Sequence, residues 1–219
     1  MRSVMRLASR VAAIVAASAL CAAAAAAQTC LGYSSLDGSH VNVTGDAAFR
    51  ASPSAEGASF GGQLNAQHDM WGERGFVGVQ LSNNSYDAPV NRSSMRLGGL
   101  LGVEQRTRDR LEWCPQVNVM YEAGPGSSRS AWQMGAGVGI GKALSSNGTI
   151  ALVPFGSAGL AHLRTDVSGA HRSQTAGVFT GGLGFRFNNG AQISPSLTFT
   201  TFDNADPVFA FGVTFPVRK

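Results

Sequence analysis

The chain has 219 residues, a length suited to one domain, and only 14% of them are charged. A soluble domain carries about 25% charged residues, so part of the surface is expected to face something other than water. The formal net charge of +4 falls to +1 when the three arginines nearest the amino terminus, Arg2, Arg6 and Arg10, are left out. Because the remaining basic residues form no run, the composition argues against nucleic acid as a partner.

The amino terminus has the pattern of a cleaved signal peptide. Its arginines are followed by an apolar stretch over Val11–Leu20 and by a run of alanines that ends at Ala27. This apolar stretch is shorter than the roughly 20 residues of a membrane-spanning helix, and Ala25–Ala27 supplies an Ala-x-Ala cleavage site. We therefore predict that 1–27 is a cleaved signal peptide and that 28–39 is a short periplasmic segment.

Beyond Gln28 no apolar segment approaches the length of a spanning helix, so any crossing of a membrane would need β-strands. Apolar residues instead alternate with polar or very small ones, which is typical of strands with one apolar face. The segment Trp113–Glu122 puts Trp, Pro, Val, Val and Tyr on one face and Cys, Gln, Asn, Met and Glu on the other. In Trp132–Lys142 the second face is Gln followed by four glycines.

This alternation predicts an all-β fold for residues 40–219, with ten strands favoured and eight as the alternative. The ten strands lie near 40–50, 58–68, 74–83, 94–106, 111–123, 132–144, 149–164, 176–187, 192–202 and 208–215. A set of this kind can cross a membrane only if it closes on itself, because an open edge would leave backbone groups unpaired in lipid. We therefore predict a closed antiparallel up-and-down transmembrane β-barrel whose last strand pairs with its first.

The connections between these strands alternate in predicted length. Tight connections are expected at Asp69–Glu73, Thr107–Arg110, Ser145–Gly148 and Asn188–Gly190. Longer polar segments are expected at Ala51–Gly57, Asn84–Ser93, Gly124–Ser130 and Thr165–Thr175, with a shorter one at Asp203–Asp206. Short turns on one rim and longer loops on the other are the pattern of an outer-membrane barrel, with the short turns and both termini in the periplasm.

Aromatic residues fall where such a barrel would meet the membrane interfaces. Trp113 is expected near the short-turn rim, while Tyr121 and Trp132 flank one of the longer loops. Rings with polar edges favour both membrane–water interfaces, so these three residues are the predicted aromatic belt.

With its leader, its alternating connections, its aromatic belt and its closing strand Val208–Phe215, the chain resembles the small outer-membrane β-barrel proteins. That group includes the OmpA-type transmembrane domain and the OmpX-type barrels. The resemblance covers Val41 to Phe215 and implies the outer membrane of a Gram-negative bacterium, contact with outer-membrane lipids and insertion by the outer-membrane assembly machinery. In that family the closing strand ends in an aromatic residue, whereas here 216–219 follow Phe215.

Assigning the more polar face to the lumen gathers several charges inside the barrel. The predicted lumen network consists of Arg96, Glu104, Arg106, Glu112, Glu122 and Arg186. Arg96 and Glu122 lie on adjacent strands at about the same distance from the Thr107–Arg110 turn, so we expect them to pair. Charges in such a place are costly unless paired and hydrogen-bonded. The network could gate a narrow polar passage or fill the barrel as a structural plug.

Two cysteines remain after cleavage, Cys30 and Cys114, and both are expected at the periplasmic rim. An oxidising compartment favours a disulfide between them, with two free thiols as the alternative. No histidine lies near either cysteine in the sequence, so no metal site is predicted.

Three classes of function remain open. The first is a structural or surface-interaction barrel whose long loops meet an extracellular ligand, and the second is a narrow porin-like channel for passive diffusion of ions or small solutes. The third and most remote is an outer-membrane hydrolase. His171-Arg172-Ser173 has the spacing that a His/Ser pair could use, but it falls in a predicted loop without an orienting acid. We therefore expect no enzyme activity and no cofactor.

Overall fold

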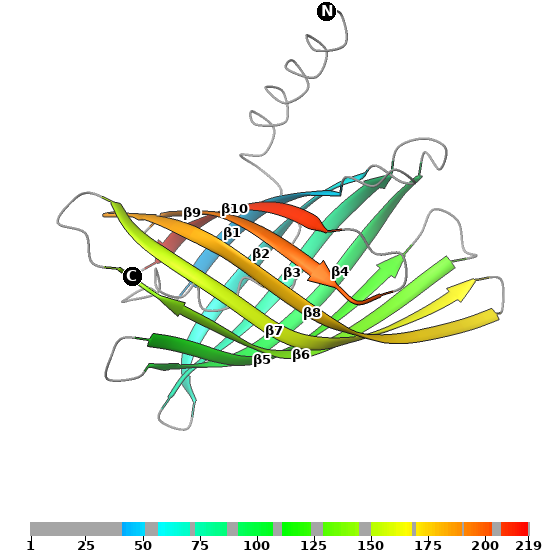
Figure 1. The fold of residues 1–219 in the computed structure, drawn as a ribbon, viewed down its shortest axis with the longest axis horizontal. Coiled ribbons are helices and arrows are strands. Elements are labelled where there is room, and N and C mark those ends of the chain that lie inside the picture. Colours follow the sequence, from blue (N-terminus) through cyan, green and yellow to red (C-terminus); the bar gives the residue numbers. More distant parts are fainter. Residues whose placement is uncertain are drawn as a thin grey trace, which may run out of the picture.

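The computed structural model of the chain is a ring of ten antiparallel strands (Figure 1). It describes residues 41–50, 57–70, 73–86, 92–106, 111–123, 129–144, 150–167, 170–189, 191–202 and 207–218. The strands are β1 (Val41–Arg50), β2 (Gly57–Met70), β3 (Glu73–Tyr86), β4 (Arg92–Arg106), β5 (Leu111–Ala123), β6 (Arg129–Lys142), β7 (Ile150–Val167), β8 (Ala170–Phe187), β9 (Gln192–Thr200) and β10 (Val208–Arg218). Within these ranges no helix has the length and hydrophobicity needed to cross a membrane.

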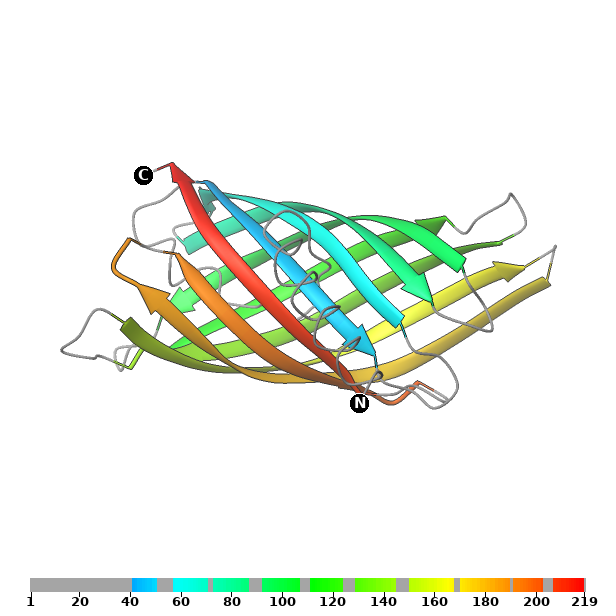
Figure 2. The ribbon, with the colours of Figure 1, turned by 90° about the horizontal axis from the view of Figure 1, so that it is seen from above.

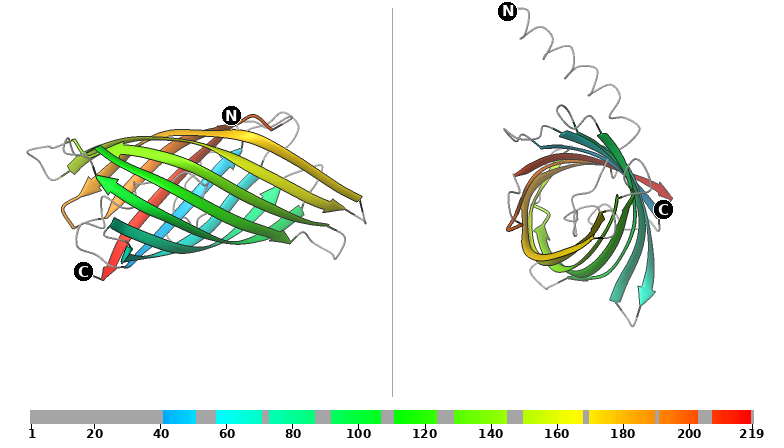
Figure 3. Two further views of the ribbon diagram at one scale, coloured as in Figure 1. Left: turned by 90° about the horizontal axis from the view of Figure 1, so that it is seen from below. Right: turned by 90° about the vertical axis from the view of Figure 1, so that its right-hand side faces the viewer.

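Each strand pairs with its neighbours in sequence, and β1 pairs with β10 to close the ring. The end-on view in Figure 3 shows this closure, and Figure 2 shows β1 and β10 side by side. The predicted closed antiparallel barrel is confirmed, and so are the favoured number of ten strands and the pairing of the last strand with the first. Closure leaves no unpaired strand edge, which is the condition for a sheet inside a membrane.

The strands are tilted because the pairing register is staggered around the ring. Followed from strand to strand once around the barrel, the ladder that starts at Arg74 on β3 returns to Tyr86 on the same strand. This displacement from position 74 to position 86, spread over ten strands, corresponds to a tilt of about 40°. A tilt of this size lets a strand of about ten residues cross the hydrocarbon layer.

The two faces of the barrel wall have the polarity of a membrane protein. On β3 the outward residues Val77, Val79 and Leu81 are about half exposed, while the inward Gln80 and Ser82 are almost completely buried. The same alternation continues around the ring, so the outer surface is apolar and the lumen is lined by polar and small residues. A soluble protein would bury the apolar face instead, so this surface is suited to lipid.

The barrel has two unlike ends, which we name by what lies there. The terminal rim is the end where β1 begins and β10 finishes, and it carries the connections at 71–72, 107–110, 143–149 and 188–191. The hairpin rim is the opposite end, from which β7 and β8 project together (Figure 2).

Two sequence-based predictions about the connections are wrong. The predicted loop Thr165–Thr175 is instead strand, because β7 and β8 continue to the connection at 168–169. Polar residues occupy both faces there, so the alternation of polar and apolar residues that marks the other strands is missing. The contrast in connection length is also weaker than predicted, since the 143–149 connection on the terminal rim is as long as those on the hairpin rim.

The closing strand also continues past its predicted end. β10 extends to Arg218, and Pro216 lies opposite Asn42 next to a shift in register between Val41 and Asn42. Proline has no backbone N–H to donate, so it is tolerated in a ladder where the pairing is irregular. The residues after Phe215 therefore lengthen the strand rather than leave it.

Candidate functional site

At the hairpin end of the lumen, Arg96 and Glu122 form an ion pair. They are direct partners on β4 and β5, and the Arg96 Nε atom lies 2.7 Å from Glu122 Oε2. The second carboxylate oxygen accepts a hydrogen bond of 2.6 Å from the Ser94 hydroxyl, which in turn lies 3.5 Å from the Asn84 amide nitrogen. The structure thus places both carboxylate oxygens of Glu122 in hydrogen bonds, as a charge inside a barrel requires.

At the terminal end of the lumen, the acidic side chains of Glu104 and Glu112 are buried. Each of these two glutamates interacts with another residue. Arg106 stands directly opposite Glu112 in the ladder, and Arg186 is half-buried on β8, opposite Gln192. The six residues expected to form one lumen network therefore lie in two groups, an ion pair near the hairpin rim and a set near the terminal rim.

Two aromatic rings narrow the lumen near its terminal end. Phe76 on β3 lies against Gly102, where a Cβ atom would come within 2.2 Å of the ring, and it clusters with Cys114 and Leu100. Phe155 on β7 lies in the same way against Gly182. The strand register and tilt place the two phenylalanine rings at about the same height along the barrel axis, on nearly opposite sides of the barrel. Gly102 and Gly182 thus leave the space that the rings of Phe76 and Phe155 fill.

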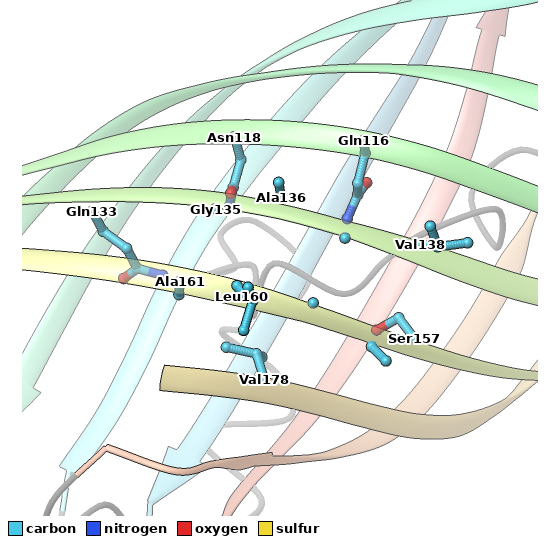
Figure 4. Close-up of a pocket in the computed structure, with 13 residues that line it drawn as sticks. Gln116, Asn118, Gln133, Gly135, Ala136, Val138, Ser157, Leu160, Ala161 and Val178 are labelled. Carbon is cyan, nitrogen blue, oxygen red and sulfur yellow. The ribbon is translucent and has the colours of Figure 1, made fainter. Parts of the chain in front are cut away.

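Between the two ends, neutral hydroxyl and amide groups line the lumen. Thr44 and Thr214 are hydrogen-bonded across β1 and β10 at 3.1 Å, and Thr180 and Thr198 across β8 and β9 at 2.7 Å. One cavity of about 40 Å³ lies along β5, β6 and β7, with the amide side chains of Gln116, Asn118 and Gln133 around it (Figure 4). This volume is enough for about one water molecule.

The three predicted belt residues occupy both ends of the outer surface. Tyr121 and Trp132 are opposite each other on β5 and β6, with ring centroids 4.8 Å apart. Trp113 lies on the same outward face of β5, eight positions nearer the terminal rim. Between these levels the outward residues are apolar, so the rings mark the two edges of the surface that faces hydrocarbon.

Cys114 is completely buried in the lumen wall near the terminal rim. Cys30 lies outside the described residues, so its pairing with Cys114 stays a prediction, as do the signal peptide 1–27 and the segment 28–39.

The hairpin of β7 and β8 carries a polar cluster that sequence analysis did not assemble. On its outward face His162 Nδ1 lies 2.8 Å from Thr175 Oγ1, above Leu160, the last apolar residue on the outward face of β7. Further out, Asp166 and His171 are direct partners in the ladder and are hydrogen-bonded through Asp166 Oδ1 and His171 Nδ1.

Arg164 completes this outward cluster. Its Nε atom lies 3.3 Å from Asp166 Oδ1 and its Nη2 atom 3.3 Å from His171 Nδ1. The hydrogen bond from His171 outweighs partial desolvation and lowers the pKa of Asp166, and Arg164 lowers it further. The acid that sequence analysis could not find for His171 is therefore Asp166, five positions away in the chain and directly opposite across the hairpin.

No group of three or more histidine, cysteine, aspartate or glutamate residues in the described part of the chain is arranged to hold a metal ion.

Comparison with solved structures identifies the fold. The β-domain of the Bordetella autotransporter BrkA is similar over 82% of this chain and 100% of its own, with a TM-score of 0.55 and 12% sequence identity. Neisserial surface protein A is 12% identical over 81% of this chain and 97% of its own, with a TM-score of 0.38. The outer membrane enzyme PagL is 12% identical over 80% and 99%, also with a TM-score of 0.38. No protein-family model and no curated protein sequence matches the chain.

The closed ring, the apolar outer surface and the likeness to the BrkA β-domain define the class of protein. It is a small β-barrel of the outer-membrane type, as the sequence pattern predicted, and its outward face is in contact with membrane lipid. At 12% identity the comparison concerns the fold alone.

Proposed function

We propose that the protein is a non-conducting outer-membrane barrel that acts at the cell surface through the β7–β8 hairpin. The observation that carries the proposal is the burial of side chains across the terminal end of the lumen. Gln192 and Cys114 are completely buried there, and Phe76 and Glu112 nearly so. A water-filled channel would leave such groups exposed along its length.

The rest of the lumen supports the same conclusion against a diffusion channel. Thr44, Gln80 and Ser82 lie in the middle of the wall and point inward, yet each is almost completely buried. Ten strands leave an interior that side chains can fill, and the inner hydroxyl and amide groups hydrogen-bond to one another. On this proposal the charged side chains of the lumen fill the barrel interior and do not gate a passage for solutes.

The projecting hairpin supports a role outside the membrane. β7 and β8 have 18 residues each, whereas about 9–11 tilted residues cross the hydrocarbon layer. From Leu160, the last apolar outward residue of β7, to Asp166 the strand rises by about 15 Å along the barrel axis. Because barrels of this class keep their termini in the periplasm, the hairpin, which lies at the opposite end, stands on the extracellular side.

Planar-bilayer recording of the purified full-length protein tests the closed lumen. We expect no conductance steps above the bilayer background at neutral pH. Steady ohmic steps from the folded protein would reject the proposal and favour the narrow diffusion channel instead.

Labelling of intact cells tests the surface position of the hairpin. Arg172→Cys, on the exposed hairpin, should react with a membrane-impermeant maleimide, whereas Lys142→Cys, exposed at the terminal rim, should react only after the cells are opened. The unmodified protein supplies the background. The reverse labelling pattern would place the hairpin in the periplasm.

A further inference from the structure

The outward face of the β7–β8 hairpin carries four residues with complementary chemistry. Asp166 is opposite His171 in the ladder, and Arg164 is opposite Ser173. His171 and Ser173 are two positions apart on one strand, so both side chains leave the same face, about 7 Å apart at their Cα atoms. All four residues lie beyond the apolar belt, on the side that the proposed function assigns to the cell surface.

The hydrogen bond to Asp166 decides which nitrogen of His171 can act as a base. Asp166 Oδ1 is ionised and can only accept, so His171 Nδ1 carries the proton of that bond. The lone pair of the neutral ring is then on Nε2, the nitrogen that points away from Asp166. A carboxylate that holds a histidine in this tautomer and stabilises its protonated form is the usual support of a serine nucleophile.

Ser173 is the candidate nucleophile, because it is the hydroxyl residue two positions from His171 on the same face of β8. It is exposed on the same face as His171, one alternation nearer the membrane. For catalysis its hydroxyl must turn toward the His171 ring, and bonds of this kind often form or tighten only when substrate binds. Arg164 is the ladder partner of Ser173, and its guanidinium group lies against Asp166 and His171, so it adds positive charge to the same outward cluster.

The depth of the cluster indicates what kind of molecule could reach it. Arg164 is the ladder partner of Trp132, whose ring marks the edge of the apolar surface. Ser173 therefore lies just above the level at which the acyl chains of an outer-leaflet lipid join its polar headgroup. An ester bond at that junction, with its chain in the membrane, would meet the outward face of the hairpin from the side.

We propose that Ser173, His171 and Asp166 form a hydrolytic site for carboxylic esters of amphiphiles in the outer leaflet. Ser173 Oγ attacks the ester carbonyl while its proton passes to His171 Nε2, and Arg164 stabilises the negative oxygen of the tetrahedral intermediate. The C–O bond to the alcohol then breaks, and the alcohol leaves with the proton held by His171. Water attacks the acyl-serine, again giving its proton to His171, which returns it to Ser173 Oγ as the carboxylic acid leaves. The net reaction consumes one ester and one water and yields one acid and one alcohol.

This inference rests on the proposed function only for the side of the membrane that the hairpin faces. The contacts of Asp166 with His171 and Arg164 would also tie the tip of the hairpin together without any chemistry. A decisive readout must therefore depend on the Ser173 hydroxyl rather than on the stability of the tip.

The test uses the full-length protein refolded in phospholipid vesicles, with folding checked by its heat-modifiable migration on gels. A fluorophosphonate probe should label the protein, and p-nitrophenyl octanoate should be hydrolysed above the rate of empty vesicles. Ser173→Ala should abolish labelling and lower hydrolysis at least 100-fold. Asp166→Asn should lower kcat about 10²- to 10⁴-fold with little change in KM, because the histidine loses its orienting acid. Ser85→Ala, an exposed outward serine near the same rim on β3, should stay within twofold of the unmodified protein.

Two results would overturn the site. One is a folded protein that neither takes the probe nor hydrolyses the ester, and the other is labelling that persists in Ser173→Ala. Conductance measured on the same vesicle preparation keeps the two proposals separate. A conducting barrel with Ser173-dependent labelling would reject the closed lumen and keep the hydrolytic site.

Discussion

Replacing Val117 with Arg should destabilise the barrel more than any other single arginine on the outward face of β5. Trp113 and Tyr121 mark the two edges of the apolar surface, and at about 3.3 Å per residue and a 40° tilt they are about 20 Å apart along the barrel axis. Val117 lies halfway between them and is 51% exposed. Arginine at the midplane of a barrel costs about 2–4 kcal/mol, which is about 30- to 1000-fold in the unfolding equilibrium.

The matched control is Gln116→Arg, at the same depth on the inner face. Gln116 borders the cavity of about 40 Å³, which can take part of the added volume, so the expected cost is below about 1.5 kcal/mol. Val119→Arg, two residues nearer Tyr121, should lie between them because the cost falls toward the interface. Reversible urea unfolding in lipid vesicles measures all three. Equal losses of unfolding free energy in Gln116→Arg and Val117→Arg would refute the assignment of the faces. A larger loss of unfolding free energy in Val119→Arg than in Val117→Arg would refute the position of the midplane.

Three further predictions concern the packing of the barrel wall at Gly102, the predicted disulfide between Cys30 and Cys114, and the stability of the β7–β8 hairpin. Gly102→Val should destabilise the barrel by about 1–3 kcal/mol because its Cβ would meet the Phe76 ring at 2.2 Å, whereas Gly99→Val, whose Cβ would meet nothing closer than 3.8 Å, should be nearly neutral in the same unfolding assay. Mass spectrometry of the unreduced protein should find Cys30 and Cys114 in one bridged peptide pair, and two alkylated thiols would reject the bridge. The lowered pKa of Asp166 means that its ionised form stabilises the hairpin above its unfolded pKa of about 3.8, and that this contribution is lost as the pH falls through the lower folded value. Hydrogen exchange at the hairpin tip should therefore speed up below about pH 4 relative to Asp166→Asn, and equal pH profiles for the two proteins would contradict this.

The proposed hydrolytic site runs against the expectation of no enzyme activity. That expectation depended on His171 and Ser173 lying in a loop with no acid beside them. The hairpin supplies Asp166 by pairing β7 with β8 as far as Val167 and Ala170. Because the sequence predicted a long loop at Thr165–Thr175, it offered no turn from which the pairing of Asp166 with His171 could be counted.

In the lumen, too, some contacts could be predicted from the sequence and others could not. Counting residues from the Thr107–Arg110 turn was enough to predict that Arg96 faces Glu122, since two strands joined by a tight turn have a determined register. Nothing in the sequence indicated that Phe76 would seat on Gly102 or Phe155 on Gly182. Those contacts depend on how neighbouring strands are staggered around the barrel. They also depend on the rotamer of each phenylalanine side chain.

The amino-acid sequence by itself determined the class of fold and the two faces of the wall, and it favoured ten strands over eight. The reason is physical: a side-chain period of two and a membrane on one side force each residue of a strand to one of two environments. Only the tertiary structure decided how far the strands continue beyond the membrane and that the lumen charges lie in two separate groups. In the projecting part of β7 and β8 both faces are polar, so periodicity carries no signal, and the strands are held by pairs such as Asp166 and His171 that exist only once the hairpin has closed.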